Sequence, residues 1–92
     1  MIKSFAHKGL KKFFETGSTA GIQAKHENKL YLILSALEGA ETIENMNLPG
    51  LRLHLLKGNK KGMWSVTVNG NWRVVFRFEN GHAYVVDYLD YH

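Results

Sequence analysis

The feature that most constrains the fold is a change in hydrophobic period near residue 51. Before it, apolar residues recur at the i, i+3, i+4, i+7 spacing of an amphipathic helix: Leu30, Ile33, Leu34 and Leu37. After it, apolar and polar residues alternate, as they do in strands that bury one face. The sequence therefore predicts helices in the N-terminal half and a β-sheet in the C-terminal half.

Two helices are expected before the change. The first carries Leu10, Phe13 and Phe14 on one side and has Gly17 in position to end it. The second spans residues 23–38, with Gly39 as its stop signal. The alternation over residues 1–5 is compatible with a short opening strand.

Four strands are expected after the change. Leu51, Leu53 and Leu55 alternate with Arg52 and His54, and a cationic connection leads to a second alternation over residues 64–68. The dipeptides 69–70 and 80–81 are both Asn-Gly, the strongest short hairpin signal. The third strand places one apolar set on its first face: Trp72, Val74, Phe76 and Phe78. The last strand runs from His82 to about Asp90.

This order predicts a single α+β domain over residues 1–92, with two N-terminal helices packed on one face of a mainly antiparallel sheet. Because strand side chains alternate between faces, the face away from the helices should collect four polar side chains: Arg52, His54, Arg73 and Arg77. Trp64 and Trp72 share the parity of the apolar set, which favours the core over base stacking.

Charge is distributed unevenly along the chain. The formal net charge is +4, but residues 45–78 contain six Lys and Arg and no Asp or Glu, which leaves −2 for the remainder. A cationic half attracts polyanions, although a solvated face with counter-ions is an equal alternative on charge alone. The rest of the chain, which is net acidic, is interpreted as a helical layer that need not contact a polyanion.

Several classes of protein are disfavoured. The chain has no Cys, and its five His show none of the paired spacings of metal-binding motifs, so we expect no metal and no cofactor. No nucleophile elbow, phosphate-binding glycine loop or dinucleotide fingerprint is present. The chain shows neither a signal peptide nor an apolar run of the ~20 residues that a membrane span needs, so we expect a cytoplasmic protein.

Five residues remain as candidate catalytic groups: His54, Lys57, Arg73, Tyr91 and His92. Cleavage of RNA through its own 2′-hydroxyl needs a base, an acid and cations around the phosphate, and these residue types supply all three. The structural alternatives are that His54 is an exposed strand histidine and that Arg73 pairs with Asp87 or Asp90. Tyr91 and His92 could form a frayed terminus. A regular strand would point Tyr91 and His92 to opposite faces.

The chain also resembles the HigB branch of the RelE/ParE superfamily of bacterial toxins. The resemblance is carried by segments along the whole length: residues 1–5, 7–10, 53–58, 62–66, 71–74 and 90–92. It implies a RelE-like, microbial-RNase-like fold and a ribosome-dependent endoribonuclease that cleaves mRNA in the A site of the 70S ribosome. It also implies a HigA-like helix-turn-helix antitoxin, with operator DNA bound only through the toxin-antitoxin complex, and no membrane partner.

The resemblance assigns roles to particular residues. The five candidates match the family's active site, with His92 the preferred proton-transfer group, and Asn71 matches an Asn that helps to read a base. Further RNA-binding positions are expected from charge and matching: Asp90, Arg52, Lys60, Lys61 and Arg77. A non-catalytic ParE-like toxin and a plain nucleic-acid-binding module remain the alternatives.

Overall fold

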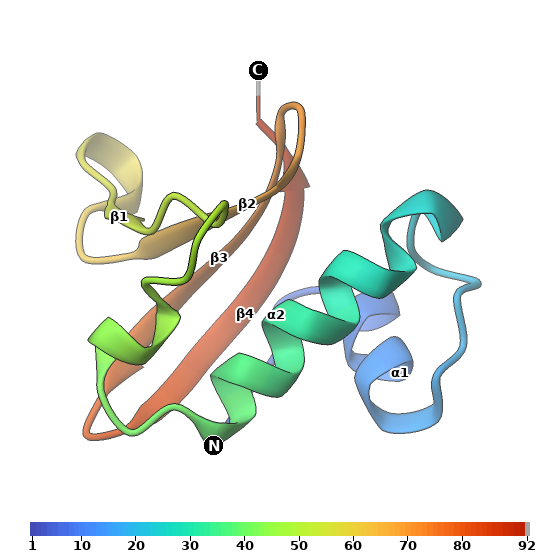
Figure 1. The fold of residues 1–92 in the computed structure, drawn as a ribbon, viewed down its shortest axis with the longest axis horizontal. Helices are drawn as coiled ribbons and strands as arrows, with labels where there is room; N and C mark the ends of the chain where they lie inside the picture. The colour runs from blue at the N-terminus through green and yellow to red at the C-terminus, as the bar shows by residue number, and fades with distance from the viewer. Residues whose placement is uncertain (92) are drawn as a thin grey trace.

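The N-terminal half is helical in the computed structural model, which describes residues 1–91 (Figure 1). Helix α1 spans Lys8–Thr16; the Nδ1 atom of His7 accepts a hydrogen bond from the amide of Leu10 at 3.0 Å, and Gly17 ends the helix with φ 80°. Helix α2 spans Glu27–Gly39 and buries all four residues of its apolar stripe. Both predicted helices are therefore present.

The boundaries of the second helix differ from the prediction. Its expected first turn is a separate 3-10 turn, η1 (Ala24–His26), because short 3-10 segments commonly lead into α-helices. Gly39 is the last helical residue rather than a left-handed cap, and the backbone of Ala40 is already extended. A further 3-10 turn, η2 (Ile43–Met46), follows.

The C-terminal half forms a four-stranded antiparallel sheet in the order β1-β2-β3-β4. Its strands are β1 (His54–Leu55), β2 (Trp64–Asn69), β3 (Trp72–Glu79) and β4 (His82–Asp90), and η3 (Gly58–Lys60) lies between the first two. The opening segment runs parallel to β4, with bridges from Ile2 to Ala83 and from Phe5 to Val86. It therefore pairs along the edge of β4 that β3 leaves free. No helix in the described chain is long and apolar enough to cross a membrane.

Two details of the strands correct the sequence prediction. The first predicted strand shrinks to two residues because Arg52 adopts a left-handed backbone with φ 51°, which interrupts the alternation. The first hairpin loop is Gly70-Asn71 rather than Asn69-Gly70: Asn69 pairs with Trp72, and only Gly70 has positive φ. Glycine in the first loop position is the preference of a II′ turn.

One hydrophobic core holds the molecule together. It joins buried residues of α1 and α2 to buried residues of β2, β3 and β4, and Trp64 and Trp72 pack against it. The core interpretation of both tryptophans is therefore confirmed. The face of β3 that carries Arg73 and Arg77 points away from this cluster, and we call it the open face of the sheet.

Candidate active site on the open face of the sheet

Strand register places three of the predicted polar residues on the open face: His54, Arg73 and Arg77. His54 pairs with Ser65, which pairs with Val75, while Arg73 pairs with Thr67 one row nearer the β2–β3 turn. Two strand spacings and two residue steps put the Cα atoms of His54 and Arg73 roughly 12 Å apart.

Arg73 is held in place by the turn that precedes it. Its Nη1 atom donates to the carbonyl oxygen of Gly70 at 2.6 Å and to that of Trp72 at 3.0 Å. Nε and Nη2 have no hydrogen-bond partner among the described residues, so the guanidinium offers a free edge with parallel donors. That edge has the geometry with which Arg binds a phosphate in bidentate fashion.

The end of β4 lies beside the same turn. The amide of Tyr91 donates to the carbonyl oxygen of Asn71 at 2.8 Å, so strand pairing continues one residue past β4. Tyr91 is 40% exposed. Asp90 pairs in register with Trp72 and thus has core-side parity, opposite to Arg73. His92 lies outside the described residues, so its predicted role stays a prediction.

Three predicted cations lie in or next to η3: Lys57, Lys60 and Lys61. Leu55 pairs with Trp64, so the chain leaves β1 at the end of β2 that is remote from the β2–β3 turn. In Figure 1 the η3 segment (yellow) lies next to β1, at the end of β2 away from that turn. Lys57 is exposed at the start of this segment.

Two predicted arginines differ from expectation. Arg52 is exposed but lies outside β1, so strand parity does not place it on the open face, and its sharing of this face with Arg73 stays a prediction. Arg77 does lie on the open face, but its Nε atom is 3.3 Å from a Glu79 carboxylate oxygen and its guanidinium sits 5.0 Å from the centre of the Tyr84 ring. Its charge is thus already partly balanced.

No hydrogen bond or salt bridge within residues 1–91 joins the side chains of His54, Lys57, Arg73 and Tyr91 to one another. Nδ1 of His54 lies 3.3 Å from the carbonyl oxygen of Arg52, and the alternative partner of Arg73, Asp87, accepts from the amide of Tyr88. The described chain holds no cluster of three metal-ligating side chains. The arrangement is an open cationic surface that needs an anionic ligand to bring its groups together.

A buried polar cluster under the start of β3 was not predicted. Nδ1 of His26 lies 2.6 Å from the hydroxyl oxygen of Tyr88, which also accepts from the amide of Gln23 at 3.3 Å. Trp72 packs against both rings, 5.5 Å from His26 and 4.6 Å from Tyr88 between ring centres. Because Trp72 precedes Arg73, this cluster fixes the strand that carries the guanidinium.

The environment of this cluster changes its titration. Burial, and then the charge of Lys25, lower the pKa of His26 below its usual 6.5. Burial raises the pKa of Tyr88, against a smaller opposing effect of the Gln23 hydrogen bond. Both groups are therefore held neutral near pH 7. The apolar stripe of α2 could have identified His26 as buried, because His26 stands four residues before Leu30 and seven before Ile33.

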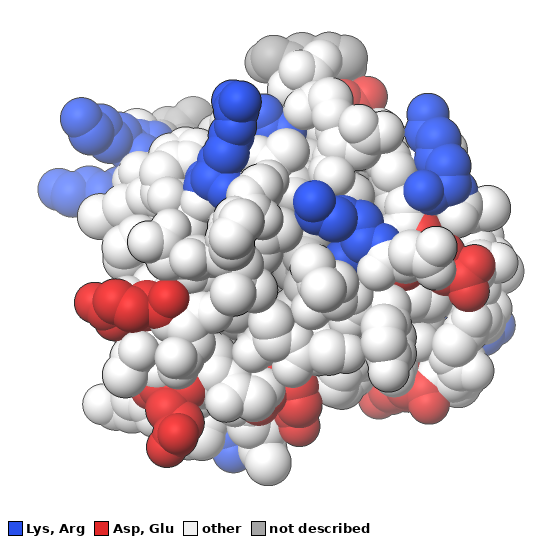
Figure 2. All heavy atoms as spheres, in the orientation of Figure 1, with Lys and Arg blue, Asp and Glu red and all other residues white. Residues whose placement is uncertain are grey.

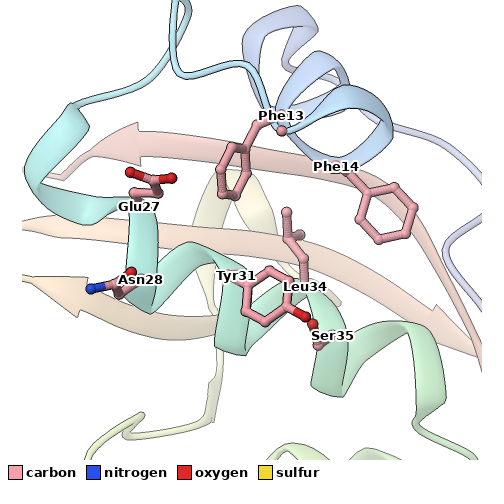
Figure 3. Close-up of a pocket in the computed structure, with 8 residues that line it drawn as sticks. Phe13, Phe14, Glu27, Asn28, Tyr31, Leu34 and Ser35 are labelled. Carbon is pink, nitrogen blue, oxygen red and sulfur yellow. The ribbon is translucent and has the colours of Figure 1, made fainter.

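A hollow on the helical side of the described structure lies away from this site. A cavity of about 340 Å³ opens between α1 and α2, lined by Phe13, Phe14, Gly17, Glu27, Asn28, Tyr31, Leu34 and Ser35 (Figure 3). It contains none of the predicted catalytic residues, and Glu27 is its one charged lining residue. None of its lining residues is a Lys or Arg that could neutralise a phosphate, so the candidate site stays on the sheet.

Comparison with known proteins now decides the family. A family model described as the RelE-like toxin of type II toxin-antitoxin system HigB matches residues 3–92. This chain belongs to the HigB-like toxin family. The HigB-like toxin is 48% identical over 92 residues to an endoribonuclease HigB from Proteus vulgaris, with 100% of both chains covered. It is 34% identical over 94 residues to toxin HigB-1 from Vibrio cholerae serotype O1, covering 100% of this chain and 98% of that one.

Solved structures agree on the fold. The HigB-like toxin is similar to a chain of the YoeB-YefM complex from Staphylococcus aureus, with TM-score 0.64 and 19% identity over 100% of this chain and 95% of that one. It is similar to a YafQ variant from E. coli, with TM-score 0.57 and 18% identity over 95% and 87%. The α+β class and the antiparallel sheet are confirmed.

Proposed function

We propose that this toxin is a ribosome-dependent mRNA endoribonuclease and that the open face of its sheet, with the helices packed on the other face, carries the reaction. The observation that carries the proposal is the anchored guanidinium of Arg73, whose free edge faces away from the core. The family membership and the name of the Proteus vulgaris relative support it.

The reaction follows from RNA's own chemistry. The 2′-hydroxyl oxygen attacks the adjacent phosphorus while a base takes its proton; the bond to the 5′-oxygen breaks, and an acid protonates that oxygen. The products are a 2′,3′-cyclic phosphate and a 5′-hydroxyl end. Such a reaction needs cations around the crowded phosphate and two proton-transfer groups, but no external nucleophile.

Residues of this chain take those roles in the proposal. Arg73 binds the scissile phosphate through its free edge, and Lys57 adds a second cation from η3. His92 and His54 are the proton-transfer pair, since imidazole is the side chain that commonly serves as general acid and base. Tyr91, beside the turn, positions the 2′-hydroxyl or stacks on a base, and Asn71 contacts a base.

The partners are proposed on the same basis. The substrate is mRNA in the A site of the 70S ribosome, and a HigA-like helix-turn-helix antitoxin neutralises the toxin. The solved YoeB-YefM complex shows that a toxin of similar fold assembles with a partner protein. Operator DNA is bound only through the complex of this toxin with its HigA-like antitoxin.

The test is cleavage of a defined mRNA on programmed 70S ribosomes, with the 5′ ends of the products mapped. Wild-type protein should cut at codon-positioned sites and leave 5′-hydroxyl ends. Deletion of His92 should abolish cutting while the far-UV spectrum stays unchanged. DNA-damage signalling without mRNA cuts, unaffected by that deletion, would instead support the ParE-like alternative.

A further inference from the structure

The loop between β2 and β3 presents two main-chain carbonyl groups that lie outside these strands. Gly70 and Asn71 form this loop. The carbonyl oxygen of Gly70 accepts from Nη1 of Arg73 at 2.6 Å, and that of Asn71 accepts from the amide of Tyr91 at 2.8 Å. The loop therefore joins the guanidinium of β3 to the chain that leaves β4.

Arg73 differs from the other cations in how its side chain is held. Figure 2 shows several Lys and Arg side chains that project into solvent from one face of the molecule. Within residues 1–91, Arg73 is the only Lys or Arg whose side chain donates hydrogen bonds to main-chain carbonyl oxygens, those of Gly70 and Trp72. A side chain that is already ordered loses less conformational entropy when it binds an anion. The contact with Gly70 thus prepares the guanidinium for a phosphate.

The direction of the Gly70 carbonyl depends on a backbone angle that few residues adopt. Gly70 has φ 55°. Rotation about the bond that defines φ moves the carbonyl group that follows it, so this angle helps to set where the oxygen points. Positive φ is uncommon for residues other than glycine and is a genuine outlier for β-branched ones. A residue that requires negative φ would therefore turn the carbonyl away from Arg73.

Space is not the reason for glycine at this position. A Cβ on Gly70 would meet no heavy atom within 4 Å. Gly9 and Gly21 show the contrasting case, because a Cβ on either would lie 2.4 Å or 2.5 Å from the backbone of the other. Gly70 is also exposed, so packing in the core does not depend on it. Its role is therefore conformational.

We infer that Gly70 is a positioning residue for the proposed reaction: its carbonyl orients the Arg73 guanidinium, and its positive φ aims that carbonyl. The inference rests on the proposed function. The hydrogen bond from Tyr91 to Asn71 holds the other half of the loop against the end of β4, which fixes the loop relative to the sheet. Gly70 acts through Arg73 and does not itself contact RNA.

The test compares three variants with the wild-type protein. Gly70→Val puts a β-branched L residue where φ is positive. Replacement of Gly70 by D-alanine, through chemical synthesis of the chain, adds a side chain whose mirror-image preference suits positive φ. Gly17→Val is the matched control, because Gly17 has φ 80°, is exposed and has open space around its Cβ position, but ends α1. Thermal melts should show similar destabilisation of the two valine variants.

Cleavage is measured in single turnovers on mRNA-programmed 70S ribosomes. Gly70→Val should lower the rate about tenfold or more, whereas the D-alanine protein and Gly17→Val should stay within about twofold of wild type. In an Arg73→Ala background, Gly70→Val should cost about twofold or less, because the carbonyl then has no guanidinium to orient. A loss of folded protein would instead cost the same in both backgrounds.

The order of the Arg73 side chain gives a readout that needs no cleavage. NMR relaxation of its Nε–H group should report an ordered side chain in the wild-type and D-alanine proteins and a mobile one in Gly70→Val. Equal order in all three proteins, or an equal cost of Gly70→Val in the two backgrounds, would overturn the inference and leave the proposed function standing. Absence of mRNA cuts by wild-type protein with an ordered Arg73 would reject the proposed function alone.

Discussion

The two faces of β3 differ in what holds their side chains. On the core side, Phe76 and Val74 are fully buried against residues from the helices and the neighbouring strands. On the open face, Arg73 is fixed by backbone carbonyls and Arg77 by a carboxylate and a ring. The core side is ordered by packing throughout, whereas the open face packs Val75 in its middle and holds its two arginines by polar contacts that leave donors unused. Binding capacity therefore lies on the face that contributes less to the core.

Phe76→Ala should give the largest effect on stability. Removal of a fully buried ring loses its transfer free energy and leaves a cavity, so we expect the free energy of unfolding to fall by about 3–5 kcal/mol. Chemical denaturation measures it. Arg77→Ala, next in the same strand, removes an exposed ion pair worth about 0–1 kcal/mol and is the control. Equal destabilisation of the two variants would contradict the contrast between the faces.

Arg73→Ala should give the largest effect on activity. Removal of a preorganised cation at the phosphate costs about 10²–10³-fold in kcat, measured as single-turnover cleavage on programmed ribosomes. Arg73→Lys should restore little, because a lysine cannot use the turn carbonyls and present a parallel pair of donors together. Arg77→Ala should cost much less, because Glu79 already balances that charge. A larger loss of kcat for Arg77→Ala than for Arg73→Ala would place the phosphate at the other end of β3.

Tyr88→Phe should weaken the support beneath the site. The change removes the hydroxyl that contacts Nδ1 of His26 and accepts from the amide of Gln23, so buried polar groups lose a partner. We expect the free energy of unfolding to fall by about 1–3 kcal/mol. Tyr31→Phe is the matched control, since Tyr31 is 70% exposed. Tyr88→Phe with wild-type stability would show that the buried hydroxyl contributes nothing net.

The pH dependence of stability should be the smallest effect. The pKa of His26 is lower in the folded state than its ordinary 6.5, so the unfolded chain binds a proton first as pH falls. Its contribution is fully present above about pH 6.5 and is lost progressively below it. His26→Gln should flatten this slope, whereas His54→Gln, at an exposed position, should leave it unchanged. Unfolding free energies at pH 5–8 make the comparison.

Much of the fold follows from local sequence. The apolar stripe of α2 and the apolar alternation of β3 are buried as their periods indicate. The backbone period of each element puts these residues on one face, and that face packs on the core. Asn80 and Gly81 both take positive φ, as the second turn requires. The first turn shifted by one residue because Gly70 is equally suited to begin a loop, and the irregular register between Thr67 and Asn69 changes the pairing there.

The candidate site was predictable only in part. Parity placed His54 and Arg73 on one face because both lie in regular strands. It gives no placement for Arg52, whose left-handed backbone breaks the alternation on which parity depends. The buried cluster joins His26 to Trp72 and Tyr88, both more than 40 positions away, and no local pattern encodes their contact.

The sequence by itself determined the elements, the core-facing side of each, and a cationic stretch over residues 45–78, since these depend on period and composition. Tertiary structure decided which donors of Arg73 stay free and how the charge of Arg77 is balanced. Backbone geometry is set over a few residues, whereas electrostatic surfaces are sums over groups that only folding brings together.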